Sequence, residues 1–459
     1  MRNLHLMLGL GLVAACGSDD GDNGRGQGDG GLVTVGAEGT ADGGSQSATQ
    51  GGDSGGVSMS GGGTGGDTAG ADTAGSAGDG TADGVPSELP KFDVGSPDGG
   101  ASCGGGLGGA PAHSNIWIAN SSQGTVSKIN TQTMVEEGRY IVKPNSAGSP
   151  SRTTVSLSAN VAIANRNGGV AKIYANIDDC VDSNGTPGIQ TSAGGADILP
   201  WGEEECVAWY TPLLYSSNRP MAWAQGDFNS STCAYENEKL WTGGANGVGT
   251  TEVLLLDGET GVVEQTIPIP QVGSSIGLYG GAVDGDGHFW GIDTAGARQL
   301  VRVDRDDFSV QIWPGPGSGY GLAVDSEGRP WFCSGGGASR FDPLSATWQS
   351  LPSPGGNAWG GCMTDGAGTL WHCRQQDATL VGIDTETLNV VQQIPLPAYA
   401  HGISVDFDGY VWAVGFASTQ AFRVDPGTGS IDTFSDLVGA YSYSDMTGFA
   451  LSSAGVPSG

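Results

Sequence analysis

The chain has 459 residues, a formal net charge of -31 at pH 7 and 84 glycines. So negative a charge argues against nucleic acids and anionic membrane surfaces as partners, because both are bound through clustered Lys and Arg side chains. Most of the glycines in excess of the usual share of roughly 7 % lie before residue 110. We therefore expect an unusual amino-terminal segment followed by a folded domain.

The amino terminus has the pattern of a signal peptide. Arg2 provides a positive start, and residues 4–13 are apolar except for one histidine, a length that fits a signal-peptide core and is too short to cross a bilayer. The sequence Ala-Ala-Cys-Gly at 14–17 resembles the lipobox of bacterial lipoproteins, in which Cys16 becomes the lipid-modified first residue. The alternative is a cleaved secretory signal with an unrelated cysteine. We predict a lipoprotein signal peptide over 1–15 and a lipid anchor in the bacterial cell envelope, with the glycine after the cysteine indicating the outer membrane.

Residues 16–110 consist mainly of Gly, Ser, Thr, Ala and Asp, with almost no large apolar side chain. Such a segment cannot bury enough apolar surface to offset the entropy that a chain loses when it is ordered. We therefore predict a disordered, Gly-rich linker that holds the folded domain away from the membrane.

Four tryptophans in the C-terminal half mark an internal repeat. They are spaced 41, 40 and 41 residues apart, and an aspartate precedes each one by six positions. A tight turn such as Asp408-Gly409 separates the aspartate from the strand that carries the tryptophan. The pairs are Asp284–Trp290, Asp325–Trp331, Asp365–Trp371 and Asp406–Trp412. A period near forty residues with four short strands per repeat is typical of a β-propeller.

The repeats predict an all-β fold, a seven-bladed β-propeller over residues 111–456. A long insertion at about 176–212 interrupts the second unit. Six blades would need two units to merge, and eight would need a blade inside that insertion. The first unit lacks its first strand, whereas residues 448–455 match the strand at 321–328. We therefore predict that the C-terminal strand completes the first blade and closes the ring, which leaves no open sheet edge.

The repeat Gly-x-Ala-Val-Asp-x-x-Gly-x-x-Trp resembles that of the virginiamycin B lyase-like, NHL-type group of seven-bladed propellers, over about residues 114–455. The resemblance implies an architecture more than an activity, because propellers carry many unrelated functions. For the streptogramin-cleaving enzymes of the group, it implies a catalytic histidine at His401, a second histidine at position 360 and a glutamate at position 415. This chain has His401, but Gly360 and Gly415 occupy the other two positions.

The residues that precede the innermost strands should surround one mouth of the central channel. Aromatic rings and a histidine there would bind a sugar, a peptide or a cyclic ligand by stacking, or would only plug the channel. The predicted ligand-binding residues are Tyr279, Tyr320, Trp359, His401 and Thr447. His401 is also the candidate catalytic residue, because a lyase needs a base opposite a metal or charged group.

Eight cysteines leave seven after lipidation, so one thiol stays free or bonds to another molecule. Cys180 and Cys206 bracket the insertion, and we predict a disulfide between them. A two-residue turn at 367–368 would place Cys362 opposite Cys373 on one face of a hairpin, which predicts a second disulfide. Cys333 is then the odd thiol, unless it bonds to a neighbour in the next blade. Two cysteines have no predicted partner, Cys103 and Cys233.

The insertion also carries side-chain oxygens at alternate positions, at Asp182, Asn184 and Thr186, as a calcium loop does. Pro187 stands where an EF-hand loop needs glycine, and no acidic residue closes the loop. We therefore expect a polar loop and not a calcium site.

These features together favour a binding protein over an enzyme. We predict a lipid-anchored, monomeric β-propeller that binds a small molecule, a glycan or a protein at its channel mouth without a cofactor. The alternative is a virginiamycin B lyase-like or lactonase-type enzyme that uses a divalent metal such as magnesium or calcium at the same mouth.

Overall fold

The computed structural model of the protein describes residues 114–294, 298–317, 320–334, 337–351 and 360–454. The predictions for the signal peptide, for Cys16, for the linker, for Cys103 and for Trp359 lie outside these residues. Within the described ranges, no helix is both long and apolar enough to cross a membrane.

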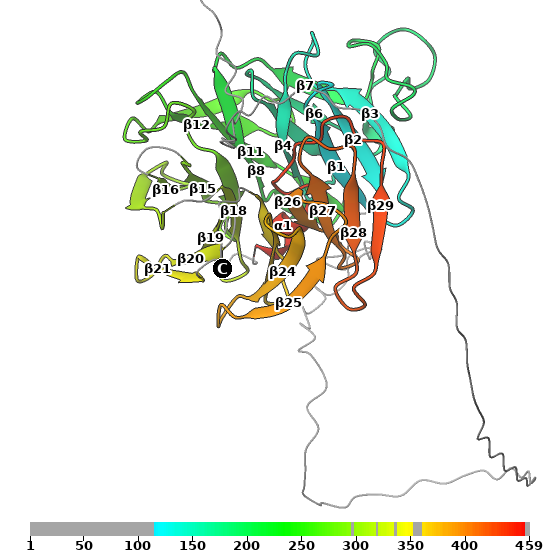
Figure 1. Ribbon diagram of the computed structural model, residues 1–459. Coiled ribbons are helices and arrows are strands. Elements are labelled where there is room, and N and C mark those ends of the chain that lie inside the picture. Colours follow the sequence, from blue (N-terminus) through cyan, green and yellow to red (C-terminus); the bar gives the residue numbers. More distant parts are fainter. Residues whose placement is uncertain (1–113, 295–297, 318–319, 335–336, 352–359, 455–459) are drawn as a thin grey trace, which may run out of the picture. The chain divides into compact units, whose positions relative to one another are not determined.

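The described residues form seven sheets arranged as blades around a common axis, together with one small inserted hairpin (Figure 1). Six blades have four antiparallel strands, and the innermost strand of each blade lies beside that of the next. The all-β, seven-bladed fold that the repeats predict is confirmed.

The bounds of the strands in the first three blades are as follows. Blade 1 contains β1 (Asn115–Asn120), β2 (Thr125–Asn130) and β3 (Glu136–Ile141). Blade 2 contains β4 (Pro150–Val155), β5 (Val161–Asn165), β6 (Val170–Ile173) and β7 (Val207–Thr211), with the 3-10 helix η1 (Ile177–Asp179) between β6 and β7. Blade 3 contains β8 (Ser217–Ala224), β11 (Lys239–Ala245), β12 (Glu252–Asp257) and β13 (Val263–Pro268), and the hairpin of β9 (Asp227–Asn229) and β10 (Ala234–Glu236) is inserted after β8.

The other four blades follow the repeat more regularly. Blade 4 contains β14 (Gly280–Val283), β15 (Phe289–Ile292), β16 (Gln299–Val303) and β17 (Val310–Pro314). Blade 5 contains β18 (Gly321–Val324), β19 (Pro330–Ser334), β20 (Gly337–Asp342) and β21 (Thr347–Leu351). Blade 6 contains β22 (Cys362–Thr364), β23 (Thr369–Arg374), β24 (Thr379–Asp384) and β25 (Val390–Pro395). Blade 7 contains β26 (Ala400–Val405), β27 (Val411–Gly415), β28 (Ala421–Val424) and β29 (Ile431–Phe434), and the helix α1 (Phe449–Ser453) follows it.

The repeated aspartate and tryptophan meet in the first turn of blades 4 to 7. In blade 7, Asp406 Oδ1 accepts hydrogen bonds from the backbone N–H groups of Asp408 (3.0 Å) and Tyr410 (2.9 Å), and Oδ2 accepts one from Trp412 Nε1 (2.8 Å). The same bond to the tryptophan measures 2.8, 2.8 and 3.1 Å in blades 4, 5 and 6. Both Asp406 and Trp412 are fully buried. The carboxylate therefore pairs three donors that would otherwise lack a partner out of water.

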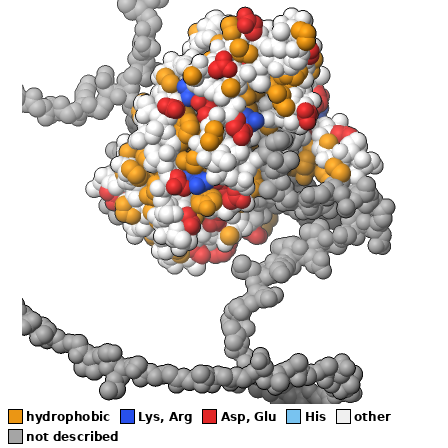
Figure 2. All heavy atoms as spheres, turned by 90° about the vertical axis from the view of Figure 1, so that its right-hand side faces the viewer, with side chains coloured by type: hydrophobic (Ala, Val, Ile, Leu, Met, Phe, Trp, Pro, Cys, Tyr) orange, Lys and Arg blue, Asp and Glu red, His pale blue; other side chains and the backbone are white. Residues whose placement is uncertain are grey.

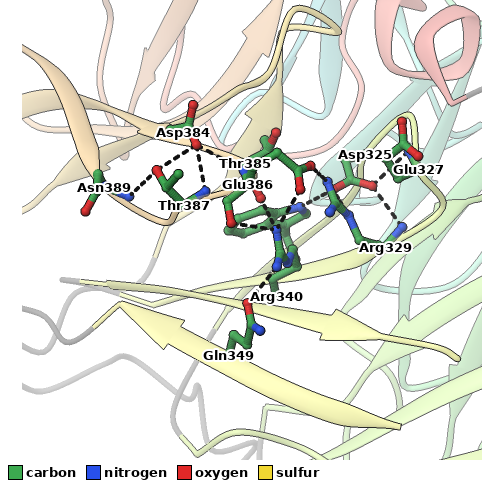
Figure 3. Close-up of polar contacts among 11 residues, drawn as sticks. Asp325, Glu327, Arg329, Arg340, Gln349, Asp384, Thr385, Glu386, Thr387 and Asn389 are labelled. Carbon is green, nitrogen blue, oxygen red and sulfur yellow. Dashed lines mark hydrogen bonds and ion pairs between the residues drawn. The ribbon is translucent and has the colours of Figure 1, made fainter. Parts of the chain in front are cut away.

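Figure 3 shows how the corresponding turn of blade 5 is joined to blade 6. Arg329 donates to Asp325 Oδ2 (2.8 Å) and forms an ion pair with Glu386. Arg340 donates to the backbone carbonyl of Thr385. Because Glu386 is exposed, its ion pair adds little stability, whereas the Arg340 bond is buried and counts for more. This cluster is therefore a connection between blades.

The C-terminal segment closes the ring beside β1. Tyr441 N–H donates to the carbonyl of Ala119 (3.0 Å), and Trp117 N–H donates to that of Met446 (2.8 Å). Residues 440–446 thus take the place of the missing inner strand of blade 1, although their only β-pairing is two isolated bridges, from Ala440 to Asn120 and to Ser418. Closure by the C-terminus is confirmed in position but not as a regular strand.

The prediction of a strand at 448–455 is wrong, because residues 449–453 form α1. Gly448 has a φ of 86°, which ends the extended conformation. The Asp445 carboxylate then accepts bonds from the N–H groups of Gly448 (2.9 Å) and Leu451 (3.3 Å), which holds the first turn of the helix. The match to the strand at 321–328 was one of composition only.

The helix α1 lies among the inner strands, near the centre of the ring in Figure 1. Leu451 belongs to a core cluster with Met221, Ala222 and Val283, which come from the inner strands of blades 3 and 4. A cavity of about 40 Å³ remains between Leu451, Asp445 and these strands. Val283 is the last residue of β14, so α1 covers the end of the channel at which the inner strands finish.

The structure contains the expected disulfide between Cys180 and Cys206. The predicted disulfide between Cys362 and Cys373 is wrong, because Cys362 is bonded to Cys333. Cys362 pairs with His372 in the β22–β23 register, so the turn has three residues and sends Cys373 to the opposite face. Cys333 instead reaches Cys362 in the next blade. Cys373 is a buried free thiol, and Cys233 is disulfide-bonded.

The insertion between β6 and β7 is organised by Glu205. Its carboxylate accepts hydrogen bonds from the backbone N–H groups of Ser183 (2.6 Å), Asn184 (2.8 Å) and Gln190 (2.9 Å). These bonds lower the pKa of Glu205. The segment that resembles a calcium loop is therefore folded around a carboxylate of its own chain.

Replacing Asp406 with alanine should leave two backbone N–H groups and one indole N–H without a partner. We expect the free energy of unfolding to fall by about 3 kcal/mol, measured by urea denaturation. The matched control is Asp425→Ala, which removes an aspartate from the exposed β28–β29 turn, where water can replace it. The control substitution should lower the free energy of unfolding by about 1 kcal/mol or less. Equal losses in the two variants would contradict the structural role of the repeated aspartate and tryptophan.

Peptide mapping without reduction should find Cys333 linked to Cys362. The Cys373 thiol should be alkylated only after unfolding, because it is buried and burial raises its pKa to about 12. Rapid alkylation of Cys373 in the native protein, or a Cys362–Cys373 peptide, would contradict the register of β22 and β23.

Candidate functional site

Three of the residues predicted at the channel mouth lie where the inner strands begin. Tyr279 and Tyr320 directly precede β14 and β18, and each continues the strand pairing through its N–H group, to Ile292 O and Cys333 O (both 2.7 Å). His401 is the second residue of β26. We call this end of the ring the channel mouth; α1 covers the other end.

Four tyrosines pack together at the channel mouth and form the tyrosine cluster: Tyr279, Tyr320, Tyr441 and Tyr443. The hydroxyl of Tyr279 lies 2.8 Å from that of Tyr441, and Tyr320 is hydrogen-bonded to both. The Tyr443 ring stacks on Tyr279, with centroids 5.8 Å apart. Burial raises the pKa of Tyr279 and Tyr320, so both hydroxyls stay protonated at neutral pH.

His401 lies against the tyrosine cluster. Its ring stacks on Tyr441, with centroids 5.3 Å apart, and meets Tyr320 edge-on at 4.9 Å. Its Nδ1 is hydrogen-bonded to the hydroxyl of Tyr399 (3.0 Å). Phe416, which follows β27, contacts the His401 ring at 4.9 Å and is 48 % exposed, so it forms part of the outer rim.

The prediction that Thr447 lies at the channel mouth is wrong. Its hydroxyl contacts the carbonyl of Val405, the last residue of β26, and so lies at the opposite end of the channel. The error follows from the register assumed for the C-terminal segment. Tyr441 and Tyr443 take the place at the mouth that Thr447 was expected to fill.

Three arginines that the sequence analysis missed surround the tyrosine cluster and form the arginine cluster: Arg152, Arg166 and Arg219. The Arg152 guanidinium carbon lies 3.0 Å from the Tyr443 ring centroid and 4.8 Å from that of Tyr279. Arg219 lies 4.9 Å from the Tyr279 ring, and Arg166 lies 4.9 Å from the Tyr441 ring. All three are within the range of cation–π attraction.

The hydrogen bonds of the arginine cluster go to neutral oxygens. Arg152 donates to the carbonyls of Tyr279 (3.0 Å) and Ser151 (3.2 Å). Arg166 and Arg219 donate to oxygens of nearby serines. Among the described residues, none of the three forms an ion pair.

Burial lowers the pKa of Arg152 to about 10, and the charge of Arg219 acts in the same direction. The pKa of Arg166 is also lowered, mainly by burial. Arg152 remains charged at neutral pH, since a pKa of about 10 lies well above 7. The channel mouth therefore holds positive charge beneath and beside aromatic rings.

A sequence signal for two of these arginines existed. Tyr279 and Tyr320 were predicted at the mouth because each directly precedes the apolar run of an inner strand. The same reasoning, applied to the runs that begin at residues 153 and 220, predicts Arg152 and Arg219 at the mouth. Arg166 and the two C-terminal tyrosines carry no such signal, because they reach the mouth from a β5–β6 turn and from the irregular closing segment.

Two of the three positions implied for lyase chemistry are occupied by glycines. A Cβ added at Gly360 would lie 3.3 Å from the Tyr399 hydroxyl, and one at Gly415 would lie 2.6 Å from the side chain of Ser418. Only His401 of the three catalytic groups is present. Among the described residues, the tyrosines, arginines and histidine named above are not side chains that magnesium or calcium prefers as ligands.

A possible metal group exists elsewhere in the described residues, where side chains of Asp284, Asp286 and His288 approach one another. It lies in the β14–β15 turn, at the other end of blade 4. Asp284 already accepts bonds from His288 N–H (3.0 Å) and Trp290 Nε1 (2.8 Å), and His288 Nδ1 accepts one from Arg305 N–H (2.9 Å). This group is part of the repeated turn.

No protein-family model and no curated protein matches the chain. Among solved structures, virginiamycin B lyase from Staphylococcus aureus is similar at 16% identity and a TM-score of 0.44, over 63% of this chain and 85% of that chain. A protein from Lactobacillus plantarum is similar at 13% identity and a TM-score of 0.50, over 72% and 98%. Hydrazine synthase from Kuenenia stuttgartiensis is similar at 11% identity and a TM-score of 0.46, over 72% and 94%. The similarity to the Lactobacillus plantarum protein is one of overall fold.

The raised pKa values of Tyr279 and Tyr320 predict a loss of stability at high pH. Below the ordinary tyrosine value of 10.0, both states keep the proton and stability is unaffected. Above it, the unfolded chain loses protons that the native protein keeps, so stability falls as pH rises. The double variant Tyr279→Phe/Tyr320→Phe should lose stability less steeply between pH 9 and 11 by urea denaturation. Identical slopes in parent and variant would contradict burial of these hydroxyls.

Proposed function

We propose that this protein is a ligand-binding β-propeller of the cell envelope that takes its ligand at the channel mouth. The observation that carries the proposal is the convergence of the arginine and tyrosine clusters on one end of the channel. Such a convergence of donors on an aromatic surface is typical of recognition sites for small molecules or for the ends of longer chains.

Free binding capacity at the channel mouth supports this proposal. Among the described residues, Arg152 Nε and the Tyr443 hydroxyl are buried and have no hydrogen-bond partner. Buried polar groups without a partner are rare in proteins, because each costs about 1–3 kcal/mol. A ligand that supplies acceptors to these groups would recover that free energy. Phe416, exposed at the rim, adds an apolar contact surface.

A second candidate, a virginiamycin B lyase-like enzyme, is supported by His401 alone. Proton abstraction next to a carbonyl needs a base and a group opposite it that stabilises the negative charge. Gly360 and Gly415 bring neither group. Binding without turnover is therefore the better-supported function.

The proposed location follows from the amino-terminal sequence. Lipid on Cys16 would anchor the chain in the envelope, and residues 16–110 would let the propeller reach a ligand at a distance from the membrane. Disulfides such as Cys180–Cys206 fit an oxidising compartment outside the cytoplasm. Growth with a labelled fatty acid should label the protein, and Cys16→Ser should abolish the label; labelling that persists in the variant would refute the anchor.

The test of the binding proposal is a thermal-shift screen of glycans, peptides and small organic molecules against the purified protein. Each hit is then titrated against Phe416→Ala, which should bind it about fivefold more weakly, because one exposed aromatic contact contributes about 1 kcal/mol. The matched control is Leu344→Ala, an exposed apolar residue of the β20–β21 turn. A hit whose affinity is equal in both variants would place binding elsewhere.

Mass analysis of each bound hit separates the two candidate functions. The binding proposal expects the ligand to be recovered unchanged. Conversion of the ligand by the parent protein, lost in His401→Ala, would overturn binding in favour of the lyase.

A further inference from the structure

We propose that the arginine cluster is an anion site, which holds a carboxylate or phosphate group of the ligand while the rest of the ligand packs on the aromatic rim. This inference rests on the proposed function of the channel mouth and names the chemistry that the mouth selects.

The first argument is the contrast with the other arginines of the chain. Most of those described are paired with carboxylates, namely Arg139, Arg302, Arg329, Arg340, Arg374 and Arg423. Within the described residues, the three of the arginine cluster have no such partner, although the chain carries 49 acidic residues against 18 basic ones. The segments left undescribed between 114 and 454 contain no Asp or Glu.

The second argument is the burial of Arg152, which is only 1 % exposed. A buried charge is costly unless it is paired, because water no longer solvates it. The lowered pKa of Arg152 reports the same cost. Cation–π contacts with Tyr443 and Tyr279 offset part of this cost, but its Nε still has no partner. An anion would supply both the missing charge and the missing acceptor.

The third argument is the graded exposure of the cluster. Arg166 and Arg219 are half-buried and reach solvent, whereas Arg152 lies beneath them with the Tyr443 hydroxyl as a further free donor. An anion can therefore approach the outer two arginines before it meets the inner one. Guanidinium groups suit this role, since their planar forks match carboxylate and phosphate oxygens.

The acidic character of the protein surface should strengthen the selection of small anions. Figure 2 shows one side of the propeller, where acidic side chains are scattered and Lys and Arg side chains are few. A basic site on an acidic protein attracts a small anion, while large polyanions are repelled by the acidic remainder of the surface. The expected ligand is therefore a small organic anion or the anionic end of a neutral chain.

The experiment measures binding of three probes at constant ionic strength, by calorimetry on the full chain. Inorganic phosphate tests phosphate, benzoate tests a carboxylate on a ring, and benzamide is the neutral isostere of benzoate. We expect benzoate or phosphate to bind saturably, and benzoate to bind about tenfold more tightly than benzamide. The stronger of the two anions identifies the group that the site prefers.

The variants are Arg219→Gln and Arg166→Gln, which lie at the half-buried edge and leave the core intact. Each should weaken anion binding about tenfold and leave benzamide unchanged. Arg305→Gln is the matched control, because Arg305 is half-buried, lies at the opposite end of blade 4 and forms no ion pair with any described residue.

Two outcomes would overturn the anion site. One is that neither anion binds above the chloride background; the other is that Arg305→Gln weakens binding as much as Arg219→Gln does. Neither outcome by itself removes the proposed function. A neutral glycan or peptide that binds in a Phe416-dependent manner would keep the channel mouth as a binding site of different chemistry.

Discussion

The structure depends on one repeated contact, in which a buried aspartate carboxylate binds the backbone of a tight turn and the indole N–H of a tryptophan six residues later. A tryptophan packed between blades must bury its N–H group, and the carboxylate is the acceptor that makes this burial tolerable. In blades 4 to 7 the contact holds the inner hairpin. Blade 3 uses backbone carbonyls instead, with Trp223 Nε1 bonded to Thr154 O and Trp241 Nε1 bonded to Gly287 O.

Rigid inner hairpins explain how separate blades can build one site. The residue at the start of each inner strand is held at the mouth. Its side chain can therefore contribute to the site, while the strand that follows it packs in the core. In blades 4 and 5 this residue is a tyrosine, and in blade 2 it is Arg152. The site combines apolar stacking with positive charge, and α1 covers the far end of the same channel. The channel mouth is therefore the end to which we assign the proposed ligand.

Much of the fold was accessible from sequence because its determinants are local and periodic. The spacing between Asp406 and Trp412 repeats in four blades. The disulfide between two cysteines that bracket an insertion can likewise be predicted without knowing how the chain packs. Predictions failed where a shift of one residue, or the conformation of one residue, decides which side chains meet. A turn of three residues instead of two moves Cys373 away from Cys362, and a left-handed Gly448 converts an expected strand into a helix.

The sequence by itself determined the number of blades, the turns between their strands and the presence of Tyr279, Tyr320 and His401 at one end of the inner strands. Tertiary structure alone decided that Tyr441 and Tyr443 complete the mouth, because this depends on contacts between β1 and a segment more than 300 residues away, such as Ala119 N–H to Ser442 Oγ. Tertiary structure also decided that, in the part of the chain that the structure describes, the arginine cluster has no carboxylate partner. Ion pairing depends on which side chains meet in space, and no local pattern of residues encodes that.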